Sequence, residues 1–244
     1  MKKQILKLLF ASAVALASTF AQAEPSRLFS QELGEVGKDI SVDLDYHLSN
    51  TFPTTNSSGL AAGVRIPAFG GEVMINTKNA LDLDRSGFTT AGAGYKAVVS
   101  RGFAVYGILS YDKVNPPGPG VSPDATSNLA IGAAYTMRQG NNLILTVNPE
   151  MVTDDGNLNG RGDKITMFLK TGVGYILPDQ KYGKWTLIGE FVAENSDFLD
   201  TTFNLGARWE RKNFTVDAVV LNNRGDKGGS NTGIPGAIRV NIAF

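Results

Sequence analysis

The sequence predicts an all-β fold, a transmembrane antiparallel up-and-down β-barrel of twelve strands. Apolar and polar residues alternate with a period of two along most of the chain, the pattern of strands with one lipid-facing side. Residues 24–244 contain no uninterrupted apolar run of about 18 residues, which excludes a transmembrane helix. The chain also begins with an export signal. In lipid, an exported sheet can pair all of its backbone N–H and C=O groups only by closing into a barrel.

Residues 1–23 have the composition of a signal peptide for the Sec pathway. Lys2, Lys3 and Lys7 precede an apolar stretch over residues 8–20, and Ala21-Gln22-Ala23 forms a small-x-small cleavage site. Removing these residues takes away three lysines and no acid, so the net charge falls from 0 to about −3. This near balance gives no reason to expect nucleic acid as a partner. The absence of cysteine excludes disulfides and thiolate metal sites.

Twelve segments carry the alternation, and most approach the ~9–11 residues that a tilted strand needs to cross the hydrocarbon. They cover residues 39–48, 58–67, 70–78, 88–98, 103–111, 127–137, 142–150, 164–176, 184–194, 201–210, 214–222 and 235–244. The pattern is clearest in 39–48, 127–137 and 164–176. It is weakest over residues 68–77, so barrels of ten or fourteen strands remain alternatives.

The connections between these segments alternate in length, as in barrels with short periplasmic turns and longer external loops. The short ones cover about 68–69, 99–102, 138–141, 177–183 and 211–213, and the others cover 49–57, 79–87, 112–126, 151–163, 195–200 and 223–234. We therefore assign the barrel to residues 39–244. Residues 24–38 precede it as an N-terminal periplasmic tail or a plug, and we expect the tail.

The last segment alternates Ile238, Val240, Ile242 and Phe244. This ending resembles the insertion signal of bacterial outer-membrane β-barrels, in which a terminal aromatic residue is read by the barrel-assembly machinery. The resemblance implies a protein integral to the outer membrane of a Gram-negative bacterium, surrounded by lipid and lipopolysaccharide. Aromatic residues agree with it, because amphipathic rings prefer the membrane interface. Those at the expected periplasmic strand ends are Tyr95, Phe103, Tyr135, Tyr175, Trp185, Trp209, Phe214 and Phe244.

The inward-facing side chains are expected to carry charges of both signs, which pair because an unpaired buried charge is unfavourable. The acids are Asp39, Asp43, Asp45, Glu72, Glu150, Glu190, Glu194, Glu210 and Asp217, and the bases are Arg65, Lys96, Lys164, Lys170, Lys184, Arg208 and Arg239. Such pairs could line a wet channel or close the lumen. Asp43, Asp45 and His47 form an acidic stripe, which could favour cations but which we expect to pair with Arg65 and Arg239.

Small residues also recur at inward positions, namely Ala61, Gly63, Gly92, Gly94, Ala130, Gly132, Gly172, Gly174 and Gly206. They could leave room for a solute, or relieve strain where a small barrel curves tightly. In size and strand number the chain resembles the oligogalacturonate and sialic-acid porins. Those families line the lumen heavily with arginine, and this chain does not, so the resemblance implies their architecture and not their substrates.

Residues 47–50 form a possible catalytic motif. His47-Leu48-Ser49-Asn50 resembles the H-x-S-N segment of outer-membrane phospholipase A and the lipid A deacylases, in which histidine activates serine for ester cleavage. The resemblance would make His47 the base and Ser49 the nucleophile. However, alternation turns both side chains toward the lumen, away from lipid.

Two external connections carry other motifs. Asp155, Asn157, Asn159 and Asp163 occupy positions 1, 3, 5 and 9 of a calcium loop, although Thr166 stands where glutamate is expected. The same composition is common in exposed turns. Arg161-Gly162-Asp163 and Arg224-Gly225-Asp226 are two RGD tripeptides, which resemble integrin ligands.

The sequence therefore favours a porin-like channel for passive diffusion of small polar solutes or ions, with neither enzymatic activity nor cofactor beyond a possible loop-bound Ca²⁺. Its selectivity would be set by Asp43, Asp45, His47, Arg65, Lys96, Lys170, Glu190, Arg208 and Arg239. The alternatives are a non-conducting barrel that displays loops for adhesion or envelope integrity, and a lipid esterase that uses His47 and Ser49.

Overall fold

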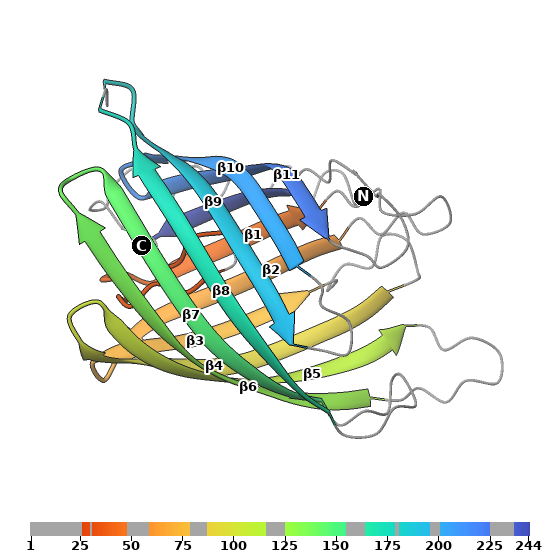
Figure 1. Cartoon of the computed structure of the whole chain (residues 1–244). Helices are drawn as coiled ribbons and strands as arrows, with labels where there is room; N and C mark the ends of the chain where they lie inside the picture. The colour runs from red at the N-terminus through yellow and green to blue at the C-terminus, as the bar shows by residue number, and fades with distance from the viewer. Residues whose placement is uncertain are drawn as a thin grey trace, which may run out of the picture.

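Figure 1 shows the computed structural model of the chain as a barrel of tilted strands. The structure describes residues 26–29, 31–47, 59–78, 87–115, 125–154, 164–178, 181–195, 201–224 and 237–244. Within these ranges, no helix is both long and apolar enough to cross a membrane.

Twelve strands form one sheet in which every strand is antiparallel to its neighbours. They are β1 (Ser41–His47), β2 (Gly59–Ala68), β3 (Gly71–Lys78), β4 (Gly87–Ser100), β5 (Phe103–Asn115), β6 (Ala125–Gln139), β7 (Leu143–Asp154), β8 (Lys164–Ile176), β9 (Lys184–Asn195), β10 (Thr201–Arg211), β11 (Phe214–Arg224) and β12 (Ala237–Ala243). β1 pairs with both β2 and β12, and this double pairing closes the barrel. The predicted closed twelve-strand barrel is thus confirmed.

The weakly patterned residues 70–78 form a full strand, β3, which pairs with β2 and β4. The alternatives of ten and fourteen strands are therefore wrong. At the β2–β3 connection, Phe69 and Gly70 both adopt positive φ, at 52° and 75°. Two successive left-handed residues make the tight turn that joins adjacent antiparallel strands. The other short connections lie at this same end of the barrel, where Figure 1 also places the C-terminus.

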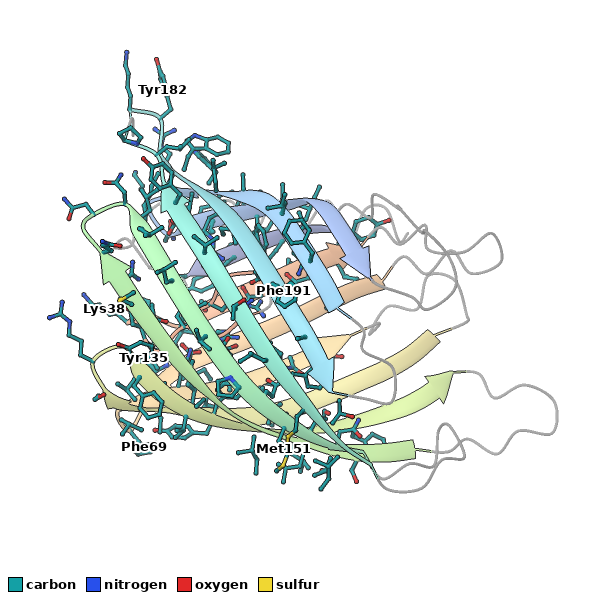
Figure 2. All side chains as sticks on the ribbon, viewed as in Figure 1. Lys38, Phe69, Tyr135, Met151, Tyr182 and Phe191 are labelled. Carbon is teal, nitrogen blue, oxygen red and sulfur yellow. The ribbon has the colours of Figure 1, made fainter. Side chains whose placement is uncertain are left out.

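The outward face is apolar, as lipid contact requires. Exposed large apolar side chains occur on most strands, among them Leu129 on β6, Leu169 on β8 and Leu205 on β10. Figure 2 shows Phe69, Tyr135 and Tyr182 projecting outward at the end with the short turns.

Aromatic side chains meet at that end in the way the sequence predicts. Trp185 and Trp209 are register partners on β9 and β10, with ring centroids 6.5 Å apart, and Phe214 lies 6.2 Å from Trp209. Trp209 Nε1 donates a hydrogen bond to the Tyr182 carbonyl oxygen (3.0 Å). An apolar body with a polar edge suits the depth of the lipid headgroups.

The N-terminal segment differs from expectation. Leu28, Gln31 and Leu33 are almost fully buried, and their neighbours bond to inward side chains of β2, β4, β7 and β9. The prediction of a periplasmic tail is therefore wrong for these residues, which lie inside the barrel as a plug. The physical reason is composition. Leu28, Phe29 and Leu33 are three apolar side chains close together, and removing their surface from water lowers the free energy.

Candidate functional site

The candidate site is the lumen, whose central feature is a folded segment of the chain itself. Arg27 and Glu32 form an isolated antiparallel bridge. The Leu28 N–H donates to the Gln31 carbonyl (2.8 Å), and the Leu33 N–H donates to the Ser26 carbonyl (2.9 Å). We call residues 26–29 and 31–37 the luminal hairpin.

One side of the luminal hairpin is apolar. Leu28, Phe29 and Leu33 form a buried cluster with Ile144, Ile176 and Ile188 on β7, β8 and β9, and Val219 of β11 packs against it. These isoleucines occupy inward positions, which a water-filled channel would keep polar. The wall therefore carries an apolar patch that matches the apolar residues of the hairpin.

The opposite side of the hairpin is ionic. Arg65 on β2 donates to both carboxylate oxygens of Glu32, at 2.6 and 2.9 Å, and Lys96 Nζ on β4 donates to the same carboxylate at 2.9 Å. Burial alone would raise the pKa of Glu32, but the two cations hold it well below its ordinary value. Glu32 is therefore a carboxylate at neutral pH.

Arg27 is the cationic partner on the hairpin. Its guanidinium lies 2.7 Å from Asp43 and 3.8 Å from Asp45 on β1. Burial lowers the pKa of Arg27, and the nearby guanidinium of Arg239 lowers it further against the opposing effect of Asp43. The surroundings therefore stabilise the charged form of Glu32 but not that of Arg27.

The hairpin is held at a third place, near the short turns. Gly34 N–H donates to Thr136 Oγ1 on β6 (2.8 Å), and Arg138 donates to both oxygens of Glu35, at 2.9 and 2.6 Å. A Cβ on Gly34 would lie 2.0 Å from the Gly102 carbonyl oxygen, so only glycine fits against the β4–β5 turn. We call Gly34 and Glu35, with these wall partners, the mouth contact.

The wall charges also pair with one another. Arg208 on β10 forms a bidentate pair with Asp217 on β11, at 2.7 and 2.9 Å. Further pairs join neighbouring strands: Arg65 with Glu72, Lys170 with Glu150, Lys184 with Glu210, and Arg239 with Asp45. The expected pairing of the β1 acids with Arg65 and Arg239 is therefore present, with Arg65 3.7 Å from Asp43.

A cavity of about 270 Å³ adjoins the hairpin and is lined by Arg27, Glu32 and wall residues that include Ala61, Asn76 and Lys170. Ala61 lies near the start of β2 and Asn76 near the end of β3, so the cavity extends toward the end with the longer connections. On the other side of the hairpin, beside Arg208 and Thr215, the space is only about 10 Å³. This is about the size of one water molecule.

The space beside most of the small inward residues is filled by other side chains of the protein. A Cβ on Gly172 would lie 2.7 Å from Leu28 Cδ1, and one on Gly206 would lie 2.8 Å from Phe29 Cζ. Gly132 accommodates the ring of Tyr106. Gly63 has only ordinary contacts and faces the cavity. Of the two alternatives for these positions, room for a solute is therefore wrong at Gly132, Gly172 and Gly206.

The structure places the side chains predicted to set selectivity in the lumen, except that nothing is described for the His47 side chain. Asp43, Arg65, Lys96, Glu190 and Arg208 are buried, while Asp45, Lys170 and Arg239 are partly exposed there. Ser49 lies outside the described residues, so the His47/Ser49 pair stays a hypothesis. The four calcium-loop candidates, Asp155, Asn157, Asn159 and Asp163, and most of both RGD tripeptides also lie outside them. Phe244 follows β12 and its N–H donates to the Ile40 carbonyl (2.8 Å).

Sequence reasoning missed Arg27, Glu32 and Glu35 because their segment has no strand alternation. The inward isoleucines of β7, β8 and β9 could have indicated a segment inside the barrel. Apolar residues on both faces of a barrel strand require an apolar partner in the lumen as well as lipid outside. Three apolar residues just before the first strand supply that partner.

No protein-family model and no curated protein sequence matches the chain. Solved structures do. The KdgM porin in complex with disordered oligogalacturonate aligns with a TM-score of 0.53 at 14% identity, covering 84% of this chain and 99% of that one. The KdgM porin alone aligns with a TM-score of 0.51, again at 14% identity and with the same coverage. The NanC porin aligns with a TM-score of 0.45 at 9% identity, covering 84% of this chain and 98% of that one. The chain is thus a closed twelve-stranded antiparallel barrel whose fold is similar to that of the KdgM porin.

Proposed function

We propose that the protein is an outer-membrane channel for passive diffusion of small polar solutes or ions. The observation that carries this proposal is the division of the wall, with an apolar outward face and an inward face of charges that pair from strand to strand. Paired inward charges are stable in a wet lumen, and a near balance of signs gives weak ion preference. The porin-like fold supports the same reading.

The solute enters, in this proposal, through the cavity of about 270 Å³. Asp45, Glu150 and Lys170 line this cavity. Lys170 pairs with Glu150 and Asp45 pairs with Arg239, and both Asp45 and Lys170 are partly exposed. Charged groups at such a place set ion preference through their field. Export by the Sec pathway, recognition of Val240, Ile242 and Phe244 by the barrel-assembly machinery, and insertion beside lipopolysaccharide complete the proposal.

The test is single-channel recording and liposome swelling with the refolded barrel, residues 24–244. Discrete conductance steps and swelling in small neutral polar solutes support a diffusion channel. Lys170→Gln leaves Glu150 without its cation, so the reversal potential in a salt gradient should shift toward cation preference. The exposed turn variant Lys181→Gln is the matched control and should leave the reversal potential unchanged.

A second candidate is a non-conducting barrel, favoured by the luminal hairpin itself. The hairpin occupies the middle of the lumen, where Lys96 is 0% and Gln31 0% exposed. Such a barrel would display its external loops for adhesion or would support envelope integrity. Persistent silence of a correctly folded sample, with and without Ca²⁺, would favour it. The esterase hypothesis fails if Ser49→Ala retains full lipid-hydrolysing activity, or if the natural chain has none.

A further inference from the structure

We propose that the luminal hairpin is a displaceable gate, fastened at the mouth contact and able to leave the lumen while the barrel stays folded. The inference rests on the proposed channel function, because a gate needs a pore to close. Four features of the described residues support it.

The barrel does not need the hairpin for its backbone hydrogen bonds. β1 is paired along its length with β2 on one side and β12 on the other, from Ser41 to His47. The hairpin adds no strand to this sheet, and its one bridge is internal, between Arg27 and Glu32. If the signal peptide is cleaved before Glu24, only residues 38–40 join the hairpin to the barrel. Its departure therefore breaks no ladder.

The wall charges keep partners when the hairpin leaves. Arg65 retains Glu72 at 2.6 Å, and Lys96 retains Glu72 at 3.5 Å. On β1, Asp43 accepts a hydrogen bond from Asn241 (2.7 Å), and Asp45 retains Arg239. Glu190, which accepts from the Gln31 N–H, also accepts from Asn204. The vacated lumen would hold paired charges in water, which is favourable compared with isolated ones.

The closed arrangement carries polar penalties that release would remove. Within the described part of the chain, Gln31 Oε1, Asn148 Oδ1 and Thr186 Oγ1 are buried with no hydrogen-bond partner. Gln31 belongs to the hairpin, and Asn148 Nδ2 donates to the Glu32 carbonyl (2.9 Å). Buried polar groups without partners are unfavourable. These penalties oppose the apolar cluster and the Glu32 ion pairs, and they reduce the preference for the closed state.

The mouth contact is partly exposed to water, so its ion pair can separate more easily than a buried one. The Glu35 and Arg138 side chains are 35% and 34% exposed, whereas the Glu32 ion pairs lie deeper. Burial differs because residues 34–37 lead from the lumen to the short-turn end. Gly34 fits against Gly102 without room for a Cβ. Separation of the mouth contact leaves the segment that leads to β1 held by one further hydrogen bond, from the Gly37 N–H to Glu72 Oε2 (3.1 Å).

The chain has no cysteine, so two introduced thiols can be linked without competing reactions. Glu35→Cys with Arg138→Cys removes the bidentate pair and puts a thiol on each side of the mouth contact. We expect open probability to rise about tenfold, because both charge-assisted hydrogen bonds are lost from a pair whose partial exposure to water weakens it. A short bis-maleimide with a cleavable disulfide should then abolish the openings, and its reduction should restore them. The matched control is the double variant Lys38→Cys with Arg138→Cys, recorded without the cross-linker. Its open probability shows the effect of losing Arg138 when the hairpin is not fastened.

A second variant tests seating without thiols. Gly34→Ala adds one methyl that cannot fit beside the Gly102 carbonyl oxygen, and it should raise open probability while leaving heat modifiability of the barrel unchanged. Lys38→Ala, at an exposed position, should behave as the natural chain. The gate is overturned if the linked variant conducts as the unlinked one does. The channel itself is overturned, and the gate with it, if a folded barrel that lacks residues 24–37 never conducts.

Discussion

Glu32 of the luminal hairpin and Arg65 of the wall form a bidentate pair deep in the lumen, with the guanidinium donating to both carboxylate oxygens at 2.6 and 2.9 Å. Arg65 also donates to Glu72 on β3 at 2.6 Å. The same cation therefore serves the hairpin and the wall. This double pairing lets Arg65 hold the closed state and remain partnered in the open one.

Glu32→Gln should weaken the closed state. The amide keeps the shape but loses the charge that Arg65 and Lys96 attract, while Glu72 still satisfies both wall cations. We expect a loss of about 1.5–3 kcal/mol in the preference for the closed state, which is roughly a 10–150-fold gain in open probability. Single-channel recording measures it. An open probability equal to that of the natural chain would show that this ion pair does not hold the hairpin.

Phe29→Ala should also favour opening, through lost apolar packing. Phe29 is 4% exposed and fills the space above Gly206. Removing a buried phenylalanine ring costs about 3–5 kcal/mol where the site cannot collapse. We expect the hairpin, and not the barrel, to bear this loss, so open probability rises while the barrel melts at the same temperature. Tyr182→Ala, which removes an exposed ring outside the lumen, is the control.

Acid should open the channel. The hydrogen bond from Arg138 lowers the pKa of Glu35 against the opposing effect of burial, and Glu32 is also lowered, both from an ordinary value of 4.5. A carboxyl group whose pKa is lowered in the closed state stabilises that state fully when the pH is above the group's ordinary pKa. This stabilisation is lost as the pH falls through the lowered pKa. Open probability should be constant from neutral pH to 4.5 and rise below it. Glu35→Gln should remove part of that rise; an unchanged profile would exclude Glu35 from the response.

Leu169→Lys tests the outward face. Leu169 is an exposed apolar residue near the middle of β8, beside inward Lys170. A lysine facing lipid near mid-membrane costs about 2–4 kcal/mol of folding free energy. Asn76→Lys, inside the lumen at the cavity, should change stability by about 0.5 kcal/mol or less. Equal stability of the two variants in urea titrations with lipid vesicles would contradict the assignment of faces.

The alternation of the sequence predicted all twelve strands, with ends that differ from the structure by a few residues. It predicted that the inward acids of the first strand pair with Arg65 and with Arg239 across the closure, and in the structure Asp45 pairs with Arg239. It did not predict the register shift between Leu205 and Gly206 opposite β11. Such irregularities depend on packing between strands, and here the hairpin side chain Phe29 lies against Gly206.

The luminal hairpin was not predicted, although a plug was an open alternative for its residues. Leu28, Phe29 and Leu33 follow neither the strand period nor the helix period, so pattern alone leaves them unassigned. Their place is fixed by tertiary contacts with Ile144, Ile176 and Ile188, residues more than a hundred positions away. Glycine at position 34 gave no local signal either, since its necessity arises from the distant Gly102 turn.

Single-channel recording of two barrels tests the central claim most directly, namely residues 24–244 and the same chain starting at residue 38. Both samples must first show the heat-modifiable mobility of a folded barrel. The account predicts intermittent steps from the longer chain and almost continuous conductance, of at least the same size, from the shorter one. Silence of the folded shorter chain would contradict the account, because the wall alone would then close the lumen.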